Sequence, residues 1–275
     1  MTEAKPHQKF KRLLLTGAGG GIGKAIRTPI AAFAEQLRLS DLAGSLPATP
    51  LPHEEIVACD LADKAAMDAL VDGCDAIIHM GGVSVERAFE QVLEANIKGV
   101  FNLYEGARRH GVKRIIFASS NHVTGFYRQD QKIDSRAPRR PDGYYGLSKS
   151  FGEDTAQFYF DRYGIESVSV RIGSAFPEPV DRRMLASWLS YADLVEVIQC
   201  GLFAADVGHT VVFGASNNKA TWWDNRYAEK LGFHPRDTSE VYRAQVESQP
   251  KPAPTDAVAV FQGGKFTTLG PFETL

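Results

Sequence analysis

A tyrosine and a lysine stand four residues apart in the run Tyr145-Gly-Leu-Ser-Lys149. At this spacing two side chains lie on one face of a helix, one turn apart. A phenol titrates near pH ~10, so a tyrosine is a poor base at neutral pH. A nearby Lys⁺ favours the phenolate and lowers that pKa. The pair therefore predicts a tyrosine that takes a proton from a hydroxyl group, although an ordinary surface helix can carry the same pattern.

Two serines, Ser119 and Ser120, end a short apolar run that begins at Arg114. If that run is a strand, the serines lie at its carboxyl end, where a reacting carbonyl or carbinol would lie. A serine hydroxyl there can hold the substrate oxygen while Tyr145 takes its proton. Either serine can alternatively be a turn residue, but we expect at least one to act at the site.

A glycine-rich loop follows the first apolar run, in Thr16-Gly17-Ala-Gly-Gly20-Gly21-Ile22-Gly23. Glycines at this spacing let the backbone approach a pyrophosphate at the N-terminus of the next helix. There the amides are unpaired and the helix dipole favours an anion. A loop between a strand and a helix is the context that the motif requires. We therefore predict a dinucleotide site that includes Gly17, Gly20, Gly21, Ile22 and Gly23.

An aspartate, Asp41, stands 18 residues beyond Gly23, at the end of the second apolar run. A carboxylate there accepts hydrogen bonds from the adenosine ribose and repels a 2′-phosphate, which favours NAD over NADP. Alternatively, Asp41 only caps a turn. Asp60 and Leu61 follow the third run and are candidates to meet the adenine, while the other interpretation of Asp60 is a cap at Ala62.

The elements that must position these residues alternate along the chain. We predict six strands at 10–15, 37–41, 55–59, 76–80, 114–119 and 167–172, with helices at 22–35, 64–71, 89–110 and 144–163. Pro29 should kink or shorten the first helix. The alternation predicts parallel β-α-β units in an open sheet covered by helices on both faces, with ligands at the carboxyl ends of the strands.

After residue 172 the alternation weakens. Ser190 can cap a helix over 191–204, residues 210–213 resemble a strand, and 223–231 resemble a short helix. We expect one domain over residues 1–275: a Rossmann-type doubly wound parallel sheet at about 10–172, with a small C-terminal substrate-binding cap at about 173–275.

Composition excludes several classes of protein. The 275 residues carry 31 Lys and Arg against 33 Asp and Glu, so a clustered basic excess for nucleic acid is not expected. The three cysteines, Cys59, Cys74 and Cys200, have no metal-ligand or disulfide spacing. The polar segment 1–9 does not resemble a signal peptide, and Asp193 and Glu196 interrupt the apolar stretch 185–205. These features predict a cytoplasmic protein without a metal, a nucleic-acid partner or a membrane span.

Together the motifs resemble the short-chain dehydrogenase/reductases. The resemblance rests on TGxxGxxG, an acid after the second strand, His79-Met80-Gly81-Gly82, Asn96, the serine pair and YxxxK, and it covers about residues 10–245. The segment 119–125 resembles SSxxVYG of the extended, sugar-nucleotide-modifying branch, with Thr124 in place of the usual tyrosine. The resemblance implies catalytic roles for Ser120, Tyr145 and Lys149. It also implies NAD contacts for Met80, Gly81, Gly82, Tyr145 and Lys149. The positive nicotinamide ring of bound NAD would then act together with Lys149 to favour the phenolate of Tyr145 and lower its pKa.

A narrower resemblance is to the hexuronate dehydrogenases, compact members that oxidise a free sugar acid. Only about 100 residues follow Ile172, which leaves little room for a nucleotide diphosphate site. The segments that carry this resemblance are Gly81–Ser84, Ser120–His122, Gly173–Ser174, Arg182–Trp188 and Trp222–Asn225. It implies substrate contacts at Ser84, Ser120, Asn121, His122 and Ser174, with Arg183 for the substrate carboxylate.

Other interpretations of these residues stay open. Arg183 and Arg182 can form a solvated basic pair, His122 can be structural, and Trp222 and Trp223 are better explained by packing than by substrate contact. The alternative functions are a nucleotide-sugar epimerase or dehydratase with tightly bound NAD, and a nucleotide-sensing regulator. Regulators of that kind usually lack the serine and the YxxxK pair. The family often dimerises through the helices expected at 89–110 and 144–163, which implies a homo-oligomer.

Overall fold

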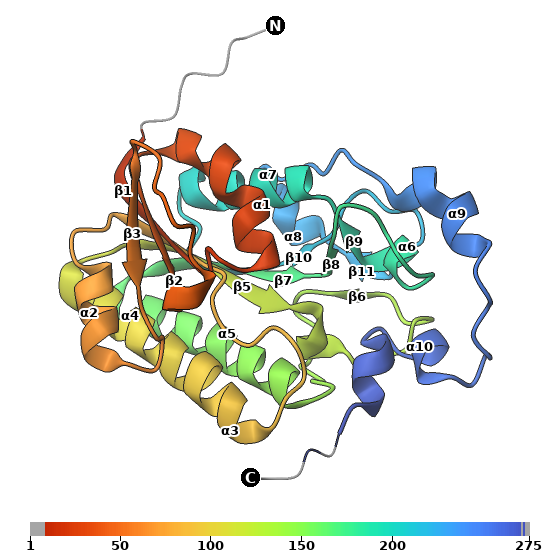
Figure 1. Cartoon of the computed structure of the whole chain (residues 1–275). Helices are drawn as coiled ribbons and strands as arrows, with labels where there is room; N and C mark the ends of the chain where they lie inside the picture. The colour runs from red at the N-terminus through yellow and green to blue at the C-terminus, as the bar shows by residue number, and fades with distance from the viewer. Residues whose placement is uncertain (1–8, 271, 273–275) are drawn as a thin grey trace, which may run out of the picture.

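The structure is a computed structural model that describes residues 9–270 and 272. A seven-stranded parallel sheet forms its centre, in the order β10-β7-β5-β4-β1-β2-β3 (Figure 1). Its strands are β1 (Phe10–Thr16), β2 (Ala34–Asp41), β3 (Glu54–Ala58), β4 (Ala76–His79), β5 (Arg114–Ser120), β7 (Glu166–Ile172) and β10 (His209–Gly214). The strand order reverses between β1 and β4, which confirms the predicted doubly wound fold and places its ligand crevice there.

Helices cover both faces of the sheet. The helices α1 (Gly21–Ile30) and α7 (Tyr191–Phe203) pack on one face, and α2 (Lys64–Val71), α4 (Gly99–His110) and α5 (Tyr144–Tyr163) pack on the other. The alternation of side chains along a strand explains both contacts. In β1, Leu13 and Leu15 pack into the first apolar cluster, whereas Leu14 packs into the second. The core therefore has two layers, one on each side of the sheet.

The bounds of the helices largely follow the predictions. Pro29 lies in the last turn of α1, which ends at Ile30 rather than at residue 35, so the expected shortening is confirmed. A short turn, η1 (Ala31–Phe33), then leads into a β2 that begins earlier than predicted. The run predicted at 89–110 divides into α3 (Phe89–Val92), a π-helical segment η3 (Leu93–Lys98) and α4.

The sheet continues beyond residue 172, where we expected the cap to begin. Strand β10 pairs with β7, and α7 packs against α1 and β5, so the predicted boundary falls within the sheet rather than at its end. Between and after these elements, short segments lie at one end of the sheet (Figure 1). They are β6 (Ile133–Asp134), β8 (Ser174–Ala175), α6 (Met184–Ser187), β9 (Trp188–Leu189), β11 (Trp223–Asp224), α8 (Arg226–Glu229), α9 (Arg243–Glu247) and α10 (Ala257–Val260), with the turns η2 (Ala43–Ser45), η4 (Asn121–Thr124), η5 (Ser239–Tyr242) and η6 (Gly264–Thr268).

The helix predicted at 223–231 is largely wrong, because only Arg226–Glu229 is α-helical. Tertiary contacts with β10 override the local pattern: Trp223 stacks on Phe213 with ring centroids 4.7 Å apart. The Asn225 side chain also exchanges two hydrogen bonds with the backbone of Phe213. Trp222 and Trp223 are buried and line neither of the two cavities described below, so the packing interpretation of both is confirmed.

Two further expectations concern absences. Over residues 9–270 and 272, no helix is long and apolar enough to cross a membrane, and no cluster of three His, Cys, Asp or Glu side chains is arranged to hold a metal ion. The polar N-terminal segment, apart from Lys9, lies outside the described residues.

Candidate active site

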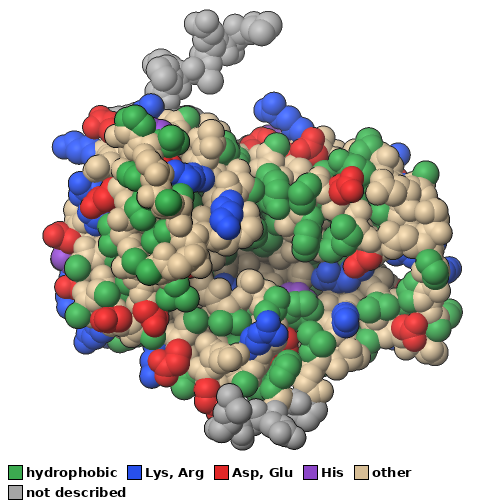
Figure 2. All heavy atoms as spheres, viewed as in Figure 1, with side chains coloured by type: hydrophobic (Ala, Val, Ile, Leu, Met, Phe, Trp, Pro, Cys, Tyr) green, Lys and Arg blue, Asp and Glu red, His purple; other side chains and the backbone are tan. Residues whose placement is uncertain are grey.

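Two adjoining cavities open at the carboxyl ends of the strands. One has a volume of about 490 Å³ and contains the glycine loop, and the other has about 780 Å³ and contains Tyr145. They share the lining residues Gly21, Ile22, Met80, Gly82, Val83 and Ser84, so they form one continuous groove. Figure 2 shows the face of the molecule hollowed at its middle, between the sheet and the C-terminal segments.

The glycine loop connects β1 to α1 and leaves no room for a side chain at Gly17, Gly19 and Gly23. Gly17 has φ +72°, and a Cβ there would lie 2.6 Å from the backbone of Met80. A Cβ at Gly23 would lie 2.1 Å from the Gly17 carbonyl oxygen. The first turn of α1 has no side-chain cap and no acidic residue, whereas Asp63 caps α2 and Ser190 caps α7. Unpaired amides on a bare backbone fit a pyrophosphate.

The predicted nucleotide residues lie together around the 490 Å³ cavity. They are Gly17, Gly20, Gly21, Ile22, Gly23, Asp41, Asp60, Leu61, Met80, Gly81 and Gly82. Asp41 accepts hydrogen bonds from the Gly19 amide at 2.9 Å and from the Leu42 amide at 2.7 Å. A carboxylate offers about four lone-pair sites, so both oxygens can accept a further bond from a ribose hydroxyl. Asp60 accepts from the Ala62 amide at 2.9 Å, so it does cap that turn.

Tyr145 and Lys149 lie on α5 and line the 780 Å³ cavity, and both are buried. Burial raises the pKa of Tyr145 to about 12, and the Ser120 hydroxyl offsets only part of this effect. Burial also lowers the pKa of Lys149 to about 8. The Lys149 Nζ is 5.7 Å from the centre of the Tyr145 ring. Without NAD, desolvation of the phenolate therefore sets the pKa of Tyr145, and the lowering expected from Lys149 together with the nicotinamide ring stays a prediction for the NAD complex.

The two serines at the end of β5 differ in their contacts. The Ser119 hydroxyl donates to Glu153 Oε1 at 2.6 Å, and Glu153 forms a buried ion pair with Arg171. Ser119 is thus bound to the protein interior. The Ser120 Oγ instead accepts a hydrogen bond from the His122 amide at 3.2 Å and lines the cavity with Tyr145. Because the oxygen accepts from the backbone, the hydroxyl hydrogen of Ser120 is left to donate toward Tyr145 or a ligand.

Arg183 is surrounded by the side chains that the sequence singled out for a sugar acid. Its guanidinium donates to Ser174 Oγ at 3.3 Å, to Asn121 Oδ1 at 3.1 Å and to the Gln262 carbonyl at 2.5 Å. Burial lowers the pKa of this group. Arg182 lines the same cavity and donates to the backbone of Gln249 at 2.9 Å. The interpretation as a solvated basic pair is wrong, because Arg183 is desolvated and bonded to the protein. Ser84 and His122 line the same cavity.

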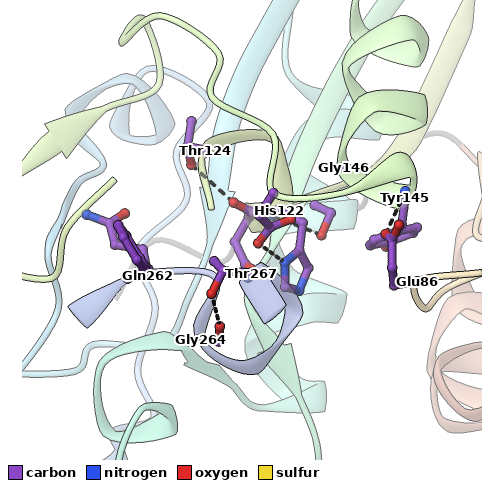
Figure 3. Close-up of polar contacts among 12 residues, drawn as sticks. Glu86, His122, Thr124, Tyr145, Gly146, Gln262, Gly264 and Thr267 are labelled. Carbon is purple, nitrogen blue, oxygen red and sulfur yellow. Dashed lines mark hydrogen bonds and ion pairs between the residues drawn. The ribbon is translucent and has the colours of Figure 1, made fainter. Parts of the chain in front are cut away.

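Two residues near His122 were not identified from the sequence. Asp142 Oδ2 lies 2.7 Å from His122 Nδ1, and the Phe266 ring stacks on the imidazole with centroids 3.9 Å apart. Figure 3 shows His122 beside the C-terminal turn that carries Gly264 and Thr267. Burial lowers the pKa of His122, and its hydrogen bond to Asp142 opposes this effect. These contacts join separate segments of the chain, so no local sequence pattern predicts them.

Glu86 and Asn96 fix the loop between β4 and α3 to the helix of Tyr145. Glu86 is buried and accepts from the amides of Tyr144 at 2.7 Å and Tyr145 at 2.9 Å (Figure 3). Asn96, in the π-helical segment, exchanges two hydrogen bonds with the Val83 backbone and donates to Ser148 on α5 at 2.9 Å. Asn96 was part of the family motif, whereas Glu86 carried no sequence signal.

Comparison with known proteins agrees with this geometry. The model of the NAD dependent epimerase/dehydratase family matches residues 13–209. The chain is 64% identical over 263 residues to a uronate dehydrogenase of Pseudomonas putida, covering 96% of this chain and 98% of that protein. It is 51% identical to a uronate dehydrogenase of Agrobacterium fabrum, covering 94% and 97%. A mutant of uronate dehydrogenase from Agrobacterium tumefaciens complexed with NAD superposes with a TM-score of 0.92 at 50% identity, covering 96% and 99%. The chain therefore belongs to the NAD-dependent epimerase/dehydratase family, among its uronate dehydrogenases.

Proposed function

We propose that the protein oxidises C1 of a free hexuronic acid, glucuronate or galacturonate, with NAD, and that the product is an aldarolactone. The observation that carries this proposal is the position of Arg183. Its guanidinium is held by Asn121 and Ser174 in the same cavity as Ser120 and Tyr145. A cation at one part of the cavity and an acid–base pair at another suit a small sugar acid.

The glycine loop and Asp41 would hold NAD, which supplies the nicotinamide carbon that accepts a hydride when it is bound. The amides at the start of α1 would bind the pyrophosphate, and the bare backbone at Gly17 and Gly23 leaves room for it. Asp41 would accept hydrogen bonds from the ribose hydroxyls and repel a 2′-phosphate, so we expect preference for NAD over NADP. Lys149 faces the groove, where it can bind the nicotinamide ribose.

Ser120 and Tyr145 would perform the proton transfer. The Ser120 hydroxyl donates to the C1 oxygen of the sugar, and the Tyr145 oxygen accepts the C1 hydroxyl proton as C1 loses its hydride. The pKa of about 12 shows that Tyr145 alone holds its proton at neutral pH. Positive charge from Lys149 and from the oxidised ring must therefore favour the phenolate during catalysis. The pKa of Lys149, about 8, leaves that amine mostly charged at pH 7.

A direct assay separates this proposal from the other functions. The protein is mixed with NAD and glucuronate, galacturonate or a UDP-sugar, and NADH absorbance is followed. Free uronates should give stoichiometric NADH, and the Tyr145→Phe variant should lose this activity while it still binds NAD. A change in a UDP-sugar without net NADH would establish the epimerase or dehydratase instead. NAD binding without turnover of any of these sugars would favour the nucleotide-sensing regulator.

We also propose that the protein forms a homo-oligomer through α4 and α5. Several large apolar side chains are exposed on these helices, between 37% and 51%: Phe101, Leu147, Phe151 and Phe158, with Tyr144 at the start of α5. Leu147, Phe151 and Phe158 are spaced so that they share one face of the helix. An exposed apolar stripe of this kind is typical of an interface between protein chains. Light scattering should give a mass above 30.1 kDa, and Leu147→Asp should lower it.

The cysteines of the chain fit a reducing compartment. Cys59, Cys74 and Cys200 are all free thiols. We therefore place the enzyme in the cytoplasm, where thiols stay reduced. Localisation of a tagged chain by cell fractionation tests this placement.

A further inference from the structure

A buried carboxylate supports the histidine of the substrate cavity. Asp142 has a side chain with no exposed surface, and it does not line the cavity that His122 lines. Its Oδ2 is 2.7 Å from His122 Nδ1, while its Oδ1 has no hydrogen-bond partner among residues 9–270 and 272. Two glycines make room for it, because a Cβ at Gly125 or Gly263 would lie 1.9 Å or 1.8 Å from Asp142 Oδ2. Within the described part of the chain, the Asp142 side chain therefore has one hydrogen-bond partner, the His122 imidazole.

This contact determines which ring nitrogen of His122 carries the hydrogen. An ionised carboxylate only accepts hydrogen bonds, so Nδ1 must donate. In a neutral imidazole the other nitrogen, Nε2, is then an acceptor. Burial lowers the pKa of His122, which keeps the ring neutral at pH 7. The ring is also fixed in orientation, since Phe266 stacks on it at 3.9 Å and Tyr145 packs edge-on at 5.7 Å.

The acceptor at His122 Nε2 contrasts with the hydrogen-bond donors of Arg183 in the same cavity. Arg183 presents N–H groups to the cavity and holds the side chain of Asn121, the residue next to His122. A carboxylate oxygen is attracted to the guanidinium, but it would be repelled by the lone pair on Nε2. A hydroxyl group, in contrast, can donate to Nε2. Neighbouring parts of the cavity wall therefore distinguish the carboxylate of a ligand from its hydroxyl groups.

We infer that Asp142 is a positioning residue that fixes His122 Nε2 as the hydrogen-bond acceptor for a hydroxyl group of the sugar acid. The inference rests on the proposed function, since it deepens the account of the same cavity. The Asp142–His122 pair then determines how the substrate is oriented. The substrate carboxylate faces Arg183, and a substrate hydroxyl group faces His122. Figure 3 shows His122, on the turn that follows β5, beside the C-terminal turn that carries Gly264.

The first test reads the proton position directly in the full-length wild-type protein. Nitrogen-15 NMR of the histidine rings distinguishes a protonated ring nitrogen from an unprotonated one, and the His122→Gln variant identifies the signals of His122. At pH 7.5 we expect a protonated Nδ1 and an unprotonated Nε2. A protonated Nε2, in either the other tautomer or the imidazolium, overturns the inference. This measurement does not depend on whether uronates are the substrates.

The second test removes the donor from the ligand. Deoxyfluoro uronates replace one hydroxyl at a time by fluorine, which cannot donate a hydrogen bond. In wild type one analogue should lose about 10- to 100-fold in kcat/KM, the usual effect of leaving a buried acceptor unpaired. In His122→Leu the same analogue should react as well as the parent sugar. Equal losses in both proteins would contradict the inference.

The third test changes the carboxylate itself. Asp142→Asn can donate to Nδ1 and so select the other tautomer, which should raise KM for uronate about tenfold or more while the Kd for NAD stays unchanged. The matched control is Asp130→Asn, whose carboxylate is 65% exposed and pairs with Arg128. Unchanged KM in Asp142→Asn overturns the positioning role, and if that variant does not fold, the NMR and analogue experiments decide. If wild type oxidises no uronate, the proposed function fails, but the NMR result still stands on its own.

Discussion

Replacing Lys149 by methionine should remove activity and stabilise the protein without NAD. Lys149 is 5% exposed, and burial lowers its pKa from 10.5 to about 8. Since one pH unit corresponds to about 1.4 kcal/mol, the charged amine costs the folded state about 3 kcal/mol at pH 7. Methionine keeps a chain of similar length without the charge. We expect the free energy of unfolding to rise by about 1–3 kcal/mol and Tm by about 2–6 °C.

The pH dependence gives this prediction its sign. Between pH 8 and 10.5 the unfolded chain keeps the Lys149 proton and the folded chain loses it, so raising the pH favours folding. The cost of Lys149 is therefore complete below pH 8 and disappears as the pH approaches 10.5. Thermal unfolding of both proteins without NAD, from pH 7 to 10, should show the largest difference at pH 7. A methionine variant that is no more stable at pH 7, or a difference that stays constant with pH, would show that the buried charge of Lys149 does not destabilise the folded protein.

Three further variants, one of them with a matched control, test separate parts of the site. Gly23→Ala places a Cβ 2.1 Å from the Gly17 carbonyl oxygen. It should lower the free energy of unfolding by about 1–3 kcal/mol, measured by thermal unfolding, and weaken NAD binding. The control Gly21→Ala has open space around its Cβ and should keep wild-type stability. Arg183→Met should raise the KM for galacturonate by about 10- to 100-fold in NADH assays and leave the KM for neutral galactose unchanged. Equal effects on both sugars would exclude a contact between Arg183 and the substrate carboxylate. Glu86→Ala leaves two amides of α5 uncapped. It should lower kcat, and it should also lower the free energy of unfolding by about 1–2 kcal/mol, while the Kd for NAD stays unchanged. An unchanged kcat would show that this cap does not position Tyr145.

Residues within one supersecondary unit could be predicted from the sequence, because local spacing determines their geometry. The loop from Gly17 to Gly23 and the pair of Tyr145 and Lys149 need only a strand, a turn and a helix. Their common position follows from the rule that parallel strands end at one edge. The place of β10 in the sheet was harder to predict, because nothing in residues 209–214 indicates that they pair with β7.

Contacts across the chain could not be predicted in this way. Glu86 reaches α5 from 58 residues earlier, and Phe266 reaches His122 from the C-terminal turn. Such contacts depend on how loops return over the sheet, which periodicity does not encode. The rise in the pKa of Tyr145 without NAD could not be predicted either, because the effect of burial on the phenolate is visible only once the packing is known.

Isotope labelling at C1 shows directly whether the hydrogen of the sugar moves to NAD. The protein is given NAD and galacturonate or glucuronate carrying deuterium at C1, and the reduced cofactor and the first product are analysed by mass spectrometry and NMR. Hydride transfer from C1 should give NADH that carries the deuterium and an aldarolactone that has lost it. NADH without deuterium, or no NADH from either free uronate, would exclude the oxidation of uronates at C1 by NAD.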